Sequence, residues 1–389
     1  MEAPRVWLGN RVLLERRPDL VQGRRLGLIT NQSGVTSDLT LTADVLRRRE
    51  DMKLRALFAP EHGISGDIRG GAHIDNTMYP GTDLPVFSLY GSTRKPTPEM
   101  LQDLDLLLFD IQDVGVRFYT YISTMAYAMQ AAAECGVDFI VLDRPNPLSD
   151  ILEGNLLDPA FASFVGVYPI LLRHGLTAGE LAGMFNAEYS IGARLTVISM
   201  QGWRRTMFFD ETGLRWVQPS PNLRSLGAAL AYPGTCLLEG TNVSAGRGTD
   251  KPFEQVGAPF VNGQSLADTL NSRELEGVRF EAVTFVPNGA KHAGEVCQGI
   301  EIQITDRRRF RPVRVGLEII VALRRLFPDD FAWREPANAQ QAYHFDLLMG
   351  TAQVRRAIES GASACDIVAG WNADQQDFEE LRTDHLLYE

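Results

Sequence analysis

The sequence is poor in cysteine, in net positive charge and in long apolar runs, and each shortage excludes a class of protein. Only four cysteines occur in 389 residues, and none forms a CxxC pair or lies at ligand spacing from a histidine. This argues against both a zinc ribbon and a disulfide framework. The net charge of −11 disfavours nucleic acid as a partner, because such binding would need a local basic patch. The three arginines at 307–309 adjoin Asp306, so a solvated turn explains them better.

Targeting and cofactor motifs are missing as well. No segment reaches the roughly 20 apolar residues of a membrane-spanning helix, and residues 1–5 do not begin a signal peptide. We therefore expect a soluble protein of the cytoplasm, or an exported one if a leader preceded Met1. The motifs GxGxxG, GxxxxGK[ST] and GxSxG are all absent. Their absence disfavours a dinucleotide site, a P-loop and an α/β-hydrolase nucleophile.

The first half of the chain alternates short apolar runs with helical periodicity, which predicts βαβ crossovers and a parallel sheet. The predicted strands cover residues 26–30, 54–59, 86–89, 104–111, 139–142 and 195–200. The predicted helices cover residues 41–49, 98–104, 121–135 and 177–189. The 104–111 run is almost continuously apolar, as expected of a central strand that is covered on both faces.

The pattern changes in the second half. An apolar run at 235–238 predicts one more strand, which leads into a Gly-rich loop at 240–257. Alternating runs at 278–286 and 299–305 predict half-buried, antiparallel strands. Helices follow at 313–327, 344–360 and 373–387. We predict an α/β fold with a Rossmann-like parallel-sheet domain at 1–258 and a smaller C-terminal α/β (α+β) domain at 259–389 that closes a cleft.

Polar clusters follow nearly every predicted strand of the first half at its carboxyl end. These ends meet at one edge of a parallel sheet, where ligands bind near a topological switch point, so we expect one shared site there. The candidate binding residues are Asn31, His62, Asp110, Asp113, Arg117, Tyr119, Tyr121, Asp143, Arg144 and Asn146.

Glu61 is the leading catalytic candidate, because it directly follows a buried strand and precedes the Gly-rich stretch 63–71. A half-desolvated carboxyl group in such a place suits a general acid, although a helix cap or a surface ion pair would also explain it. His62 next to it could be a base or a ligand, but a hydrogen-bonded supporting role is preferred.

Arg117, Tyr119 and Tyr121 together suggest a substrate clamp, since arginine binds carboxylates bidentately and aromatic rings stack on sugars. Alternatively, Tyr121 begins a core helix and only Arg117 faces the cleft. Asp110 and Asp113 could bind a metal ion with Asp143. Their spacing is not diagnostic, so we expect neither a metal nor another cofactor.

Later segments have the same polar character. Glu153 lies in the loop after the fifth predicted strand, and Arg173 and His174 precede a helix. Thr177 and Glu180 fit a capping box of that helix, so a structural role is preferred for Glu180. The loop at 240–257 and the residue before it carry hydrogen-bonding side chains separated by glycines, which suits a hydroxyl-rich or amide-bearing ligand. These candidates are Glu239, Thr241, Asn242, Ser244 and Arg247.

Four motifs resemble those of one bacterial family when they are taken in order. They read APEHGISGD, FDIQDVGVRFYTYISTM, LDRPNP and YPGTCLLEGTN. The chain resembles the exo-β-N-acetylmuramidases, long described as a domain of unknown function, from about residue 10 onwards. The resemblance implies a Rossmann-like domain and a smaller C-terminal α/β domain with the site between them. It also implies release of N-acetylmuramic acid from the non-reducing end of peptidoglycan fragments, so the expected partner is a muramic-acid-containing saccharide.

The resemblance also implies roles for individual residues. Arg117 or Arg247 would bind the lactyl carboxylate of muramic acid, and Asn242 could meet its acetamido group. Glu61 would be the general acid/base. Glycosidases usually use two carboxyl groups, and the candidates for the second are Glu153, Glu239 and Asp113. Assistance by the acetamido oxygen of the substrate would need only one.

Two other functions are open on the sequence alone. One is a metal-assisted hydrolase that uses Asp110, Asp113 and Asp143. The other is a protein that binds muropeptide fragments without cleaving them.

Overall fold

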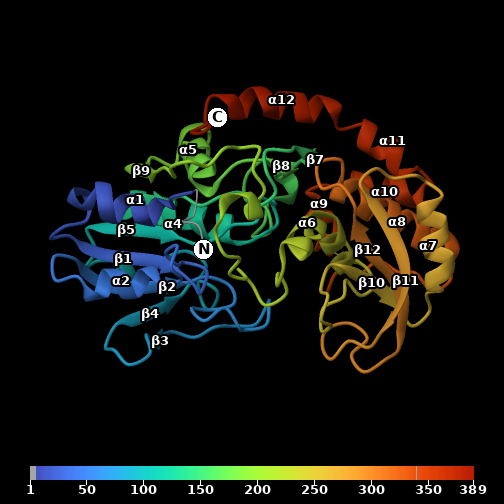
Figure 1. Ribbon diagram of the computed structural model, residues 1–389, viewed down its shortest axis with the longest axis horizontal. Helices are drawn as coiled ribbons and strands as arrows, with labels where there is room; N and C mark the ends of the chain where they lie inside the picture. Colours follow the sequence, from blue (N-terminus) through green and yellow to red (C-terminus); the bar gives the residue numbers. More distant parts are fainter. Residues whose placement is uncertain (1–5, 339) are drawn as a thin grey trace.

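The apolar runs of the first half form a seven-stranded sheet in the computed structural model, which describes residues 6–338 and 340–389 (Figure 1). Its strands lie side by side in the order β3-β4-β2-β1-β5-β6-β9. All neighbours are parallel except the short β3, which runs antiparallel to β4. The strand bounds are β1 Arg25–Thr30, β2 Lys53–Ala59, β3 Thr77–Met78, β4 Pro85–Ser88, β5 Leu106–Asp110, β6 Asp138–Leu142 and β9 Leu195–Ile198.

Helices cover both faces of this sheet, and the central strands are therefore apolar on both sides. In β5, Leu107 and Phe109 enter the core on one face, whereas Leu106 and Leu108 enter the core on the other. One face packs against α1 (Gly9–Arg16) and α2 (Thr42–Arg48). The opposite face packs against α3 (Pro98–Leu101), α4 (Tyr121–Cys135) and α5 (Ala178–Glu188). This two-sided burial explains the nearly continuous apolar run of β5.

The winding of the chain reverses between β1 and β5. The chain steps from β1 outward to β2 and β4, then returns to form β5 on the other side of β1. The carboxyl ends of β1, β2 and β5 therefore meet at a topological switch point, the usual place for a ligand in an open α/β sheet.

The second half of the chain forms a smaller domain around an antiparallel sheet in the order β10-β12-β11. These strands are β10 Gln255–Ala258, β11 Val278–Phe285 and β12 Cys297–Ile304. Helix α7 (Gly263–Asn271) packs on β11 and β12 and against α8 (Pro312–Leu326), and α6 (Leu226–Thr235) packs against α8 in turn. The moderate length of each strand and its half-buried alternation match an antiparallel sheet that one helical layer covers.

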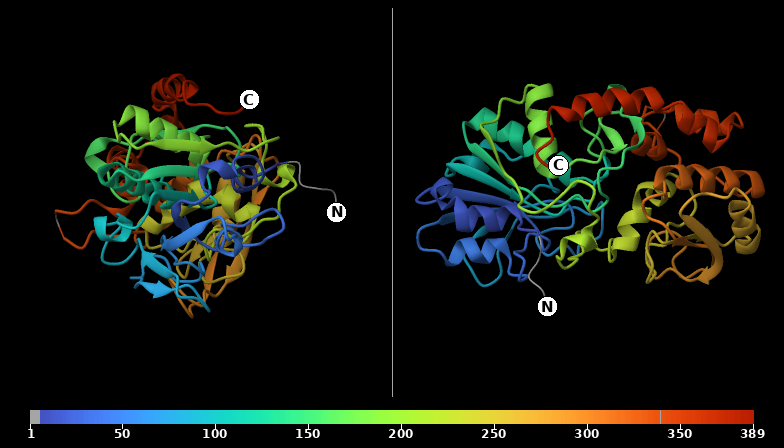
Figure 2. Two further views of the ribbon diagram at one scale, coloured as in Figure 1. Left: turned by 90° about the vertical axis from the view of Figure 1, so that its left-hand side faces the viewer. Right: turned by 45° about the horizontal axis from the view of Figure 1, so that its top comes forward.

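The remaining elements include a hairpin at the junction of the two domains. This two-stranded hairpin consists of β7 (Glu153–Leu156) and β8 (Leu171–Arg173). The other helices are α9 His344–Met349, α10 Gln353–Glu359, α11 Ala364–Ala369 and α12 Asn372–Thr383, with short 3-10 turns η1 Pro18–Leu20, η2 Pro159–Phe161, η3 Phe209–Thr212 and η4 Cys236–Gly240. Helix α12 crosses from the smaller domain back to the larger one, as the views of Figure 2 show.

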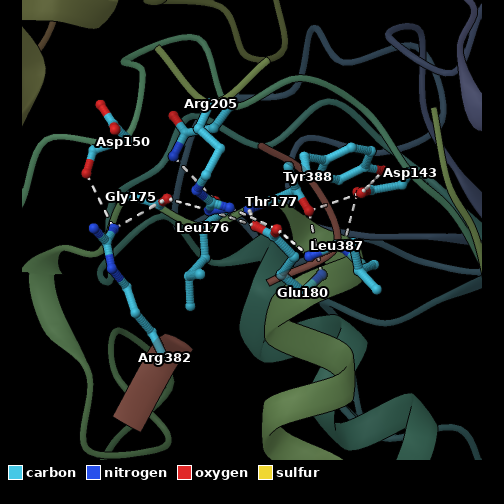
Figure 3. A network of polar contacts seen from close by, with 12 residues as sticks. Asp143, Asp150, Gly175, Leu176, Thr177, Glu180, Arg205, Arg382, Leu387 and Tyr388 are labelled. Carbon is cyan, nitrogen blue, oxygen red and sulfur yellow. Dashed lines mark hydrogen bonds and ion pairs between the residues drawn. The ribbon is translucent and has the colours of Figure 1, made fainter. Parts of the chain in front are cut away.

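The residues after α12 fasten the chain to the N-terminal domain through a polar network (Figure 3). Tyr388 donates a hydrogen bond of 2.6 Å to Asp143, and the backbone N–H of Leu387 donates to Glu180. Glu180 also closes a capping box with Thr177 at the start of α5. The structural role predicted for Glu180 is therefore confirmed.

One apolar core extends through both domains. It includes Leu107 of the large sheet, Leu172 of the junction hairpin, and Ile320 and Phe378 of the C-terminal helices. A second core lies under α1 and α2 on the other face of the large sheet. The two domains are therefore distinct in topology but share their interior.

The predicted fold class is confirmed, with two local corrections. Residues 235–238 form the end of α6 and the beginning of η4, because the preceding Ala-rich and Leu-rich residues favour a buried helix over a strand. The predicted helix 344–360 is two helices, since Gly350 ends α9 in the left-handed conformation at φ 69°. The division at residue 258 stays a prediction. Within the described part of the chain, no helix is both long and apolar enough to cross a bilayer.

Candidate active site

A cleft of about 620 Å³ opens at the carboxyl edge of the large sheet, and both domains line it. This volume lies in the usual range for a pocket that binds a small molecule. The N-terminal domain contributes Glu61, His62, Arg69, Gly70, Gly71, Tyr90, Arg94, Phe118, Tyr119, Thr120, Phe164 and Val165. The remainder of the lining consists of Ser220, Asn222, Tyr232, Cys236, Glu239, Arg247, Phe253, Ala290, Lys291, Arg334, His344 and Leu348.

Glu61 enters this cleft from the loop after β2, where Pro60 ends the strand. Its Oε2 accepts a hydrogen bond of 2.7 Å from the hydroxyl of Thr120, and its Oε1 accepts one of 2.8 Å from the N–H of Gly71. The side chain remains only partly buried. These two hydrogen bonds fix the orientation of the Glu61 carboxyl group, and a ligand in the cleft can still reach it.

His62 supports the loop that follows Glu61. Its backbone adopts φ 73°, and its Nδ1 bonds the carbonyl oxygen of Ile68 at 2.7 Å, so Nδ1 carries the proton. Burial lowers the pKa of His62. A neutral, hydrogen-bonded imidazole agrees with the supporting role that the sequence favoured.

Glu239 faces the cleft from the C-terminal domain. Arg247 Nε lies 3.1 Å from Glu239 Oε1, so the two side chains form an ion pair. A methyl group on Gly70 would lie 3.5 Å from Glu61 Oε1 and 3.9 Å from Arg247 Nη1. The ion pair of the C-terminal wall therefore lies close to the Glu61 loop, and Gly70 leaves the space between them open.

Positive charge dominates the lining of the cleft. Five lysine and arginine side chains line it against two carboxylates, Glu61 and Glu239. Lys291 donates to the carbonyl oxygens of Leu238 and Val243, and burial lowers its pKa to about 8. Such a surface favours an anionic ligand.

Of the residues predicted from the sequence, five line the cleft. They are Glu61, His62, Tyr119, Glu239 and Arg247. The others lie beneath it or behind it, and most support the loops that shape it.

Arg117 is the main correction to the predicted substrate clamp. Its guanidinium is buried and donates to backbone carbonyl oxygens of both domains, with no carboxylate beside it. The acceptors are those of Asn155, Ile170, Leu348 and Met349. Tyr121 begins α4, and its hydroxyl donates to the carbonyl oxygen of Pro219. Its side chain is therefore also buried in the interior. Of the three, only Tyr119 reaches the cleft.

Asp110, Asp143 and Arg144 form a buried frame below the strand ends. Arg144 Nε lies 2.6 Å from Asp110 Oδ1, and Asp143 accepts from Thr177 and Tyr388. Asn146, which also lies in the interior, caps its own turn by accepting from the N–H of Leu148 and donating to Leu176. These side chains hold loops in place and do not line the cleft.

Asp113 is buried and separate from the other two aspartates. Its Oδ2 accepts from the N–H of Gly115 and lies 4.0 Å from Nε2 of His174. Burial raises the pKa of Asp113 to about 7 and lowers that of His174 to about 3. Across residues 6–338 and 340–389, no three His, Cys, Asp or Glu side chains are grouped so that they could hold a metal ion. The alternative of a metal-binding cluster of Asp110, Asp113 and Asp143 is therefore contradicted.

Glu153 lies behind the cleft, not in it. It is buried on β7, where its Oε1 accepts from the N–H of Arg314 in the first turn of α8 and its Oε2 lies 4.0 Å from Arg173. Burial raises the pKa of Glu153 to about 7. Glu153 thus ties the junction hairpin to α8 and does not line the cleft, as a second catalytic carboxylate would have to.

The polar residues of the Gly-rich loop mainly shape the loop itself. Thr241 donates to Leu238, Asn242 bonds the backbone of residues 330 and 332, and Ser244 accepts from Gly246. Asn31, which follows β1, similarly accepts hydrogen bonds from the N–H and the hydroxyl of Ser33. Of the polar candidates in this loop only Arg247 reaches the cleft, and the aromatic ring of Phe253 lines it as well.

The sequence did not reveal several cleft residues, although one positional signal was present. Tyr90 and Arg94 follow β4, so the rule that located Glu61 after β2 also applies to them. Lys291, Arg334 and His344 come from loops far along the chain. No local pattern connects these three with the sheet edge.

Two family models together cover most of the chain. The model described as exo-beta-N-acetylmuramidase NamZ, N-terminal, matches residues 26–227, and the corresponding C-terminal model matches residues 230–388. The break between them falls within the first turns of α6.

The chain is also similar to individual proteins over nearly its whole length. It is 48% identical over 386 residues to the peptidoglycan beta-N-acetylmuramidase NamZ of Bacillus subtilis (strain 168), covering 99% of this chain and 92% of that protein. A solved DUF1343 family structure from Bacteroides fragilis superposes with a TM-score of 0.92 at 38% identity and covers 100% of both chains. A second structure from that organism gives a TM-score of 0.78 at 30% identity, with 99% of each chain covered.

Proposed function

Because the chain belongs to the exo-beta-N-acetylmuramidase NamZ family, we propose that it removes N-acetylmuramic acid from peptidoglycan fragments with Glu61 as general acid/base. It is a glycoside hydrolase that acts on a peptidoglycan-derived saccharide. The sugar is released from the non-reducing end, and the bond that breaks is the one between its anomeric carbon and the glycosidic oxygen.

The observation that carries the role of Glu61 is its position in the cleft. Glu61 is partly exposed at the carboxyl edge of the sheet, and two hydrogen bonds from Thr120 and Gly71 fix its orientation. A general acid must reach the substrate oxygen within hydrogen-bond distance while its own geometry is held. No other carboxyl group of the N-terminal wall lines the described cleft.

The chemistry follows from this geometry. Protonated Glu61 donates its proton to the glycosidic oxygen while that oxygen separates from the anomeric carbon. Ionised Glu61 then takes a proton from the water that attacks the anomeric carbon, which restores the acid form. Positive charge builds up on the sugar ring between these steps and has to be stabilised.

Glu239 is the carboxylate that we assign to this stabilisation. It lines the cleft on the wall of the C-terminal domain and is paired with Arg247. The other two candidates, Glu153 and Asp113, are buried outside the cleft. Substitution of Glu239 by Gln therefore separates a carboxylate-assisted reaction from one that depends on the acetamido oxygen alone. If the carboxylate assists the reaction, the Glu239→Gln variant loses most of its kcat. If the acetamido oxygen alone assists it, the variant keeps its kcat.

The test of Glu61 uses a chromogenic N-acetyl-β-muraminide as substrate. The change Glu61→Gln keeps the size of the side chain but removes the transferable proton, so we expect kcat to fall by about 10³-fold. Thermal unfolding should be close to that of the unmodified enzyme, since Glu61 is only partly buried.

Glu153→Gln is the matched control, because it makes the same chemical change outside the cleft. We expect its kcat to be nearly unchanged even if its stability changes. Near-normal sugar release by Glu61→Gln would overturn the assignment. A chain that binds muraminides but releases no sugar over long incubation would overturn the hydrolase itself.

A further inference from the structure

Arg94 has an environment that differs from that of every other cation in the cleft. Its guanidinium carbon lies 4.5 Å from the ring centre of Tyr90 and 4.3 Å from that of Phe164. The two rings are 5.7 Å apart, and Phe164 also packs against Tyr127 of α4. Stacking on two rings restricts a guanidinium while its N–H edge is left available for a ligand.

The charge of Arg94 has no partner of opposite sign in the described part of the chain. No carboxylate there lies within ion-pair distance of it, although the cleft contains two carboxylates. Arg247 pairs with Glu239, and Lys291 donates to two carbonyl oxygens. Arg69 and Arg334 also lack a carboxylate among the described residues, but no aromatic ring of that part holds either of them.

Arg94 stands on the same wall of the cleft as Glu61, with Tyr90 between them. Burial, followed by the negative charge of Glu61, raises the pKa of Tyr90 to about 12, and the charge of Arg94 opposes this rise. Tyr90 therefore neighbours both groups. A sugar whose anomeric carbon is at Glu61 would have its ring substituents within reach of Arg94.

Muramic acid differs from glucosamine by a lactyl ether on C3, two ring atoms from the anomeric carbon, and this ether ends in a carboxylate. We propose that Arg94 binds this lactyl carboxylate and thereby selects muramic acid over glucosamine, an inference that rests on the proposed function. The sequence pointed to Arg117 or Arg247 for this task. The first is buried against backbone carbonyls, and the second is paired with Glu239.

The experiment compares two 4-nitrophenyl substrates, the N-acetyl-β-muraminide and its lactyl carboxamide, which has nearly the same shape but no charge. In the unmodified enzyme, kcat/KM should be about 50-fold higher for the carboxylate, as a charge-assisted bidentate pair would give. Arg94→Gln should reduce this ratio to near one, mainly by raising KM for the carboxylate. Arg94→Lys should keep part of the ratio, since it retains the charge but loses the planar fork.

Arg69→Gln and Arg334→Gln are the matched controls, because both residues are exposed cleft arginines. They should keep the ratio. Phe164→Leu, which removes one stacking ring but keeps the guanidinium, should give an intermediate value. Arg94 is exposed, so its variants should unfold at the same temperature as the parent enzyme.

The outcomes separate this inference from the proposed function. An enzyme that hydrolyses the muraminide but keeps its full ratio in Arg94→Gln overturns the role of Arg94 and leaves the hydrolase intact. An equal loss on both substrates also overturns it, since that would indicate a general positioning effect. No hydrolysis of either substrate by the unmodified chain would contradict the proposed function. In that case, tighter binding of muramic acid than of N-acetylglucosamine, abolished by Arg94→Gln, would still support the Arg94 site.

Discussion

The hydroxyl of Thr120 donates a hydrogen bond of 2.7 Å to Oε2 of Glu61, and this bond joins the loop after β2 to the start of α4. Two elements of the large domain thus meet at the carboxyl group that we assign as the acid. The other carboxyl oxygen is held by the backbone of Gly71. The orientation of Glu61 is therefore set by its neighbours before a substrate arrives.

Removal of the Thr120 hydroxyl should misplace the acid without emptying the cleft. In Thr120→Val the shape of the side chain is nearly kept, so we expect KM to change little and kcat to fall roughly 10-fold. Thr120→Ser retains the donor and serves as the control, with kcat within about twofold of the parent. Steady-state kinetics on a chromogenic muraminide measures both parameters. An unchanged kcat in the valine variant would show that this bond does not position Glu61.

Arg117 should matter for stability and not for substrate selection. Arg117→Met removes the guanidinium donor from four buried carbonyl oxygens, of which those of Met349 and Ile170 keep a second donor, so we expect the free energy of unfolding to fall by about 3 kcal/mol. Denaturant titration measures this loss. The ratio of kcat/KM between the charged and uncharged muraminides should stay at its parental value in the folded enzyme. A collapse of that ratio would restore Arg117 as a ligand of the lactyl group.

Lys291 should limit activity at alkaline pH. Burial lowers its pKa to about 8, so its ammonium loses a proton well below the ordinary range of lysine, and its bonds to Leu238 and Val243 weaken. We expect kcat/KM to decline as the pH rises through about 8. Lys291→Arg should move this decline to higher pH, because arginine keeps its charge. Lys251→Arg, a change at an exposed lysine, is the control and should not move it.

The sign of the stability effect distinguishes this loss of activity from unfolding. Between about pH 8 and 10 the unfolded lysine keeps its proton while the folded one has lost it, so this group alone makes the fold more stable as the pH rises. Activity and stability should therefore change in opposite directions over that window, as pH–rate profiles and thermal unfolding in the same buffers would show. A parallel loss of both would contradict the role of Lys291.

Tyr388 should stabilise the attachment of α12 to the large domain. Its hydroxyl donates to Asp143 and accepts from the N–H of Met200. Tyr388→Phe keeps the ring but removes both bonds, so we expect a loss of about 1–2 kcal/mol in unfolding free energy and an unchanged kcat. Tyr189→Phe, which removes a single half-buried hydroxyl bond, should cost less. Equal losses of unfolding free energy would indicate that the bonds of Tyr388 in the network of Figure 3 stabilise the fold no more than the single bond of Tyr189.

Periodicity and position located much of this architecture. The parallel sheet follows from apolar runs that alternate with helical stretches, and Glu61 follows from the convergence of strand ends at one edge. The same reasoning selected Arg117 and passed over Arg94, although both are arginines that follow strands. What separates them is burial and partners, since four carbonyls surround one and two rings flank the other. Those contacts come from residues far away in sequence, so no local pattern encodes them.

Both domains share one apolar interior. The two family models therefore divide the sequence into two parts, but we expect neither part to fold by itself. Leu172 and Phe345 belong to one apolar cluster with the strands of the large sheet. Residues 230–388 expressed alone would expose their side of this cluster, and residues 26–227 would expose the complementary side. Calorimetry of the whole chain should accordingly give a single transition whose van't Hoff and calorimetric enthalpies agree. A chimaera that joins the N-terminal part of one relative to the C-terminal part of another would fold only if the interior residues of both parts came from the same relative.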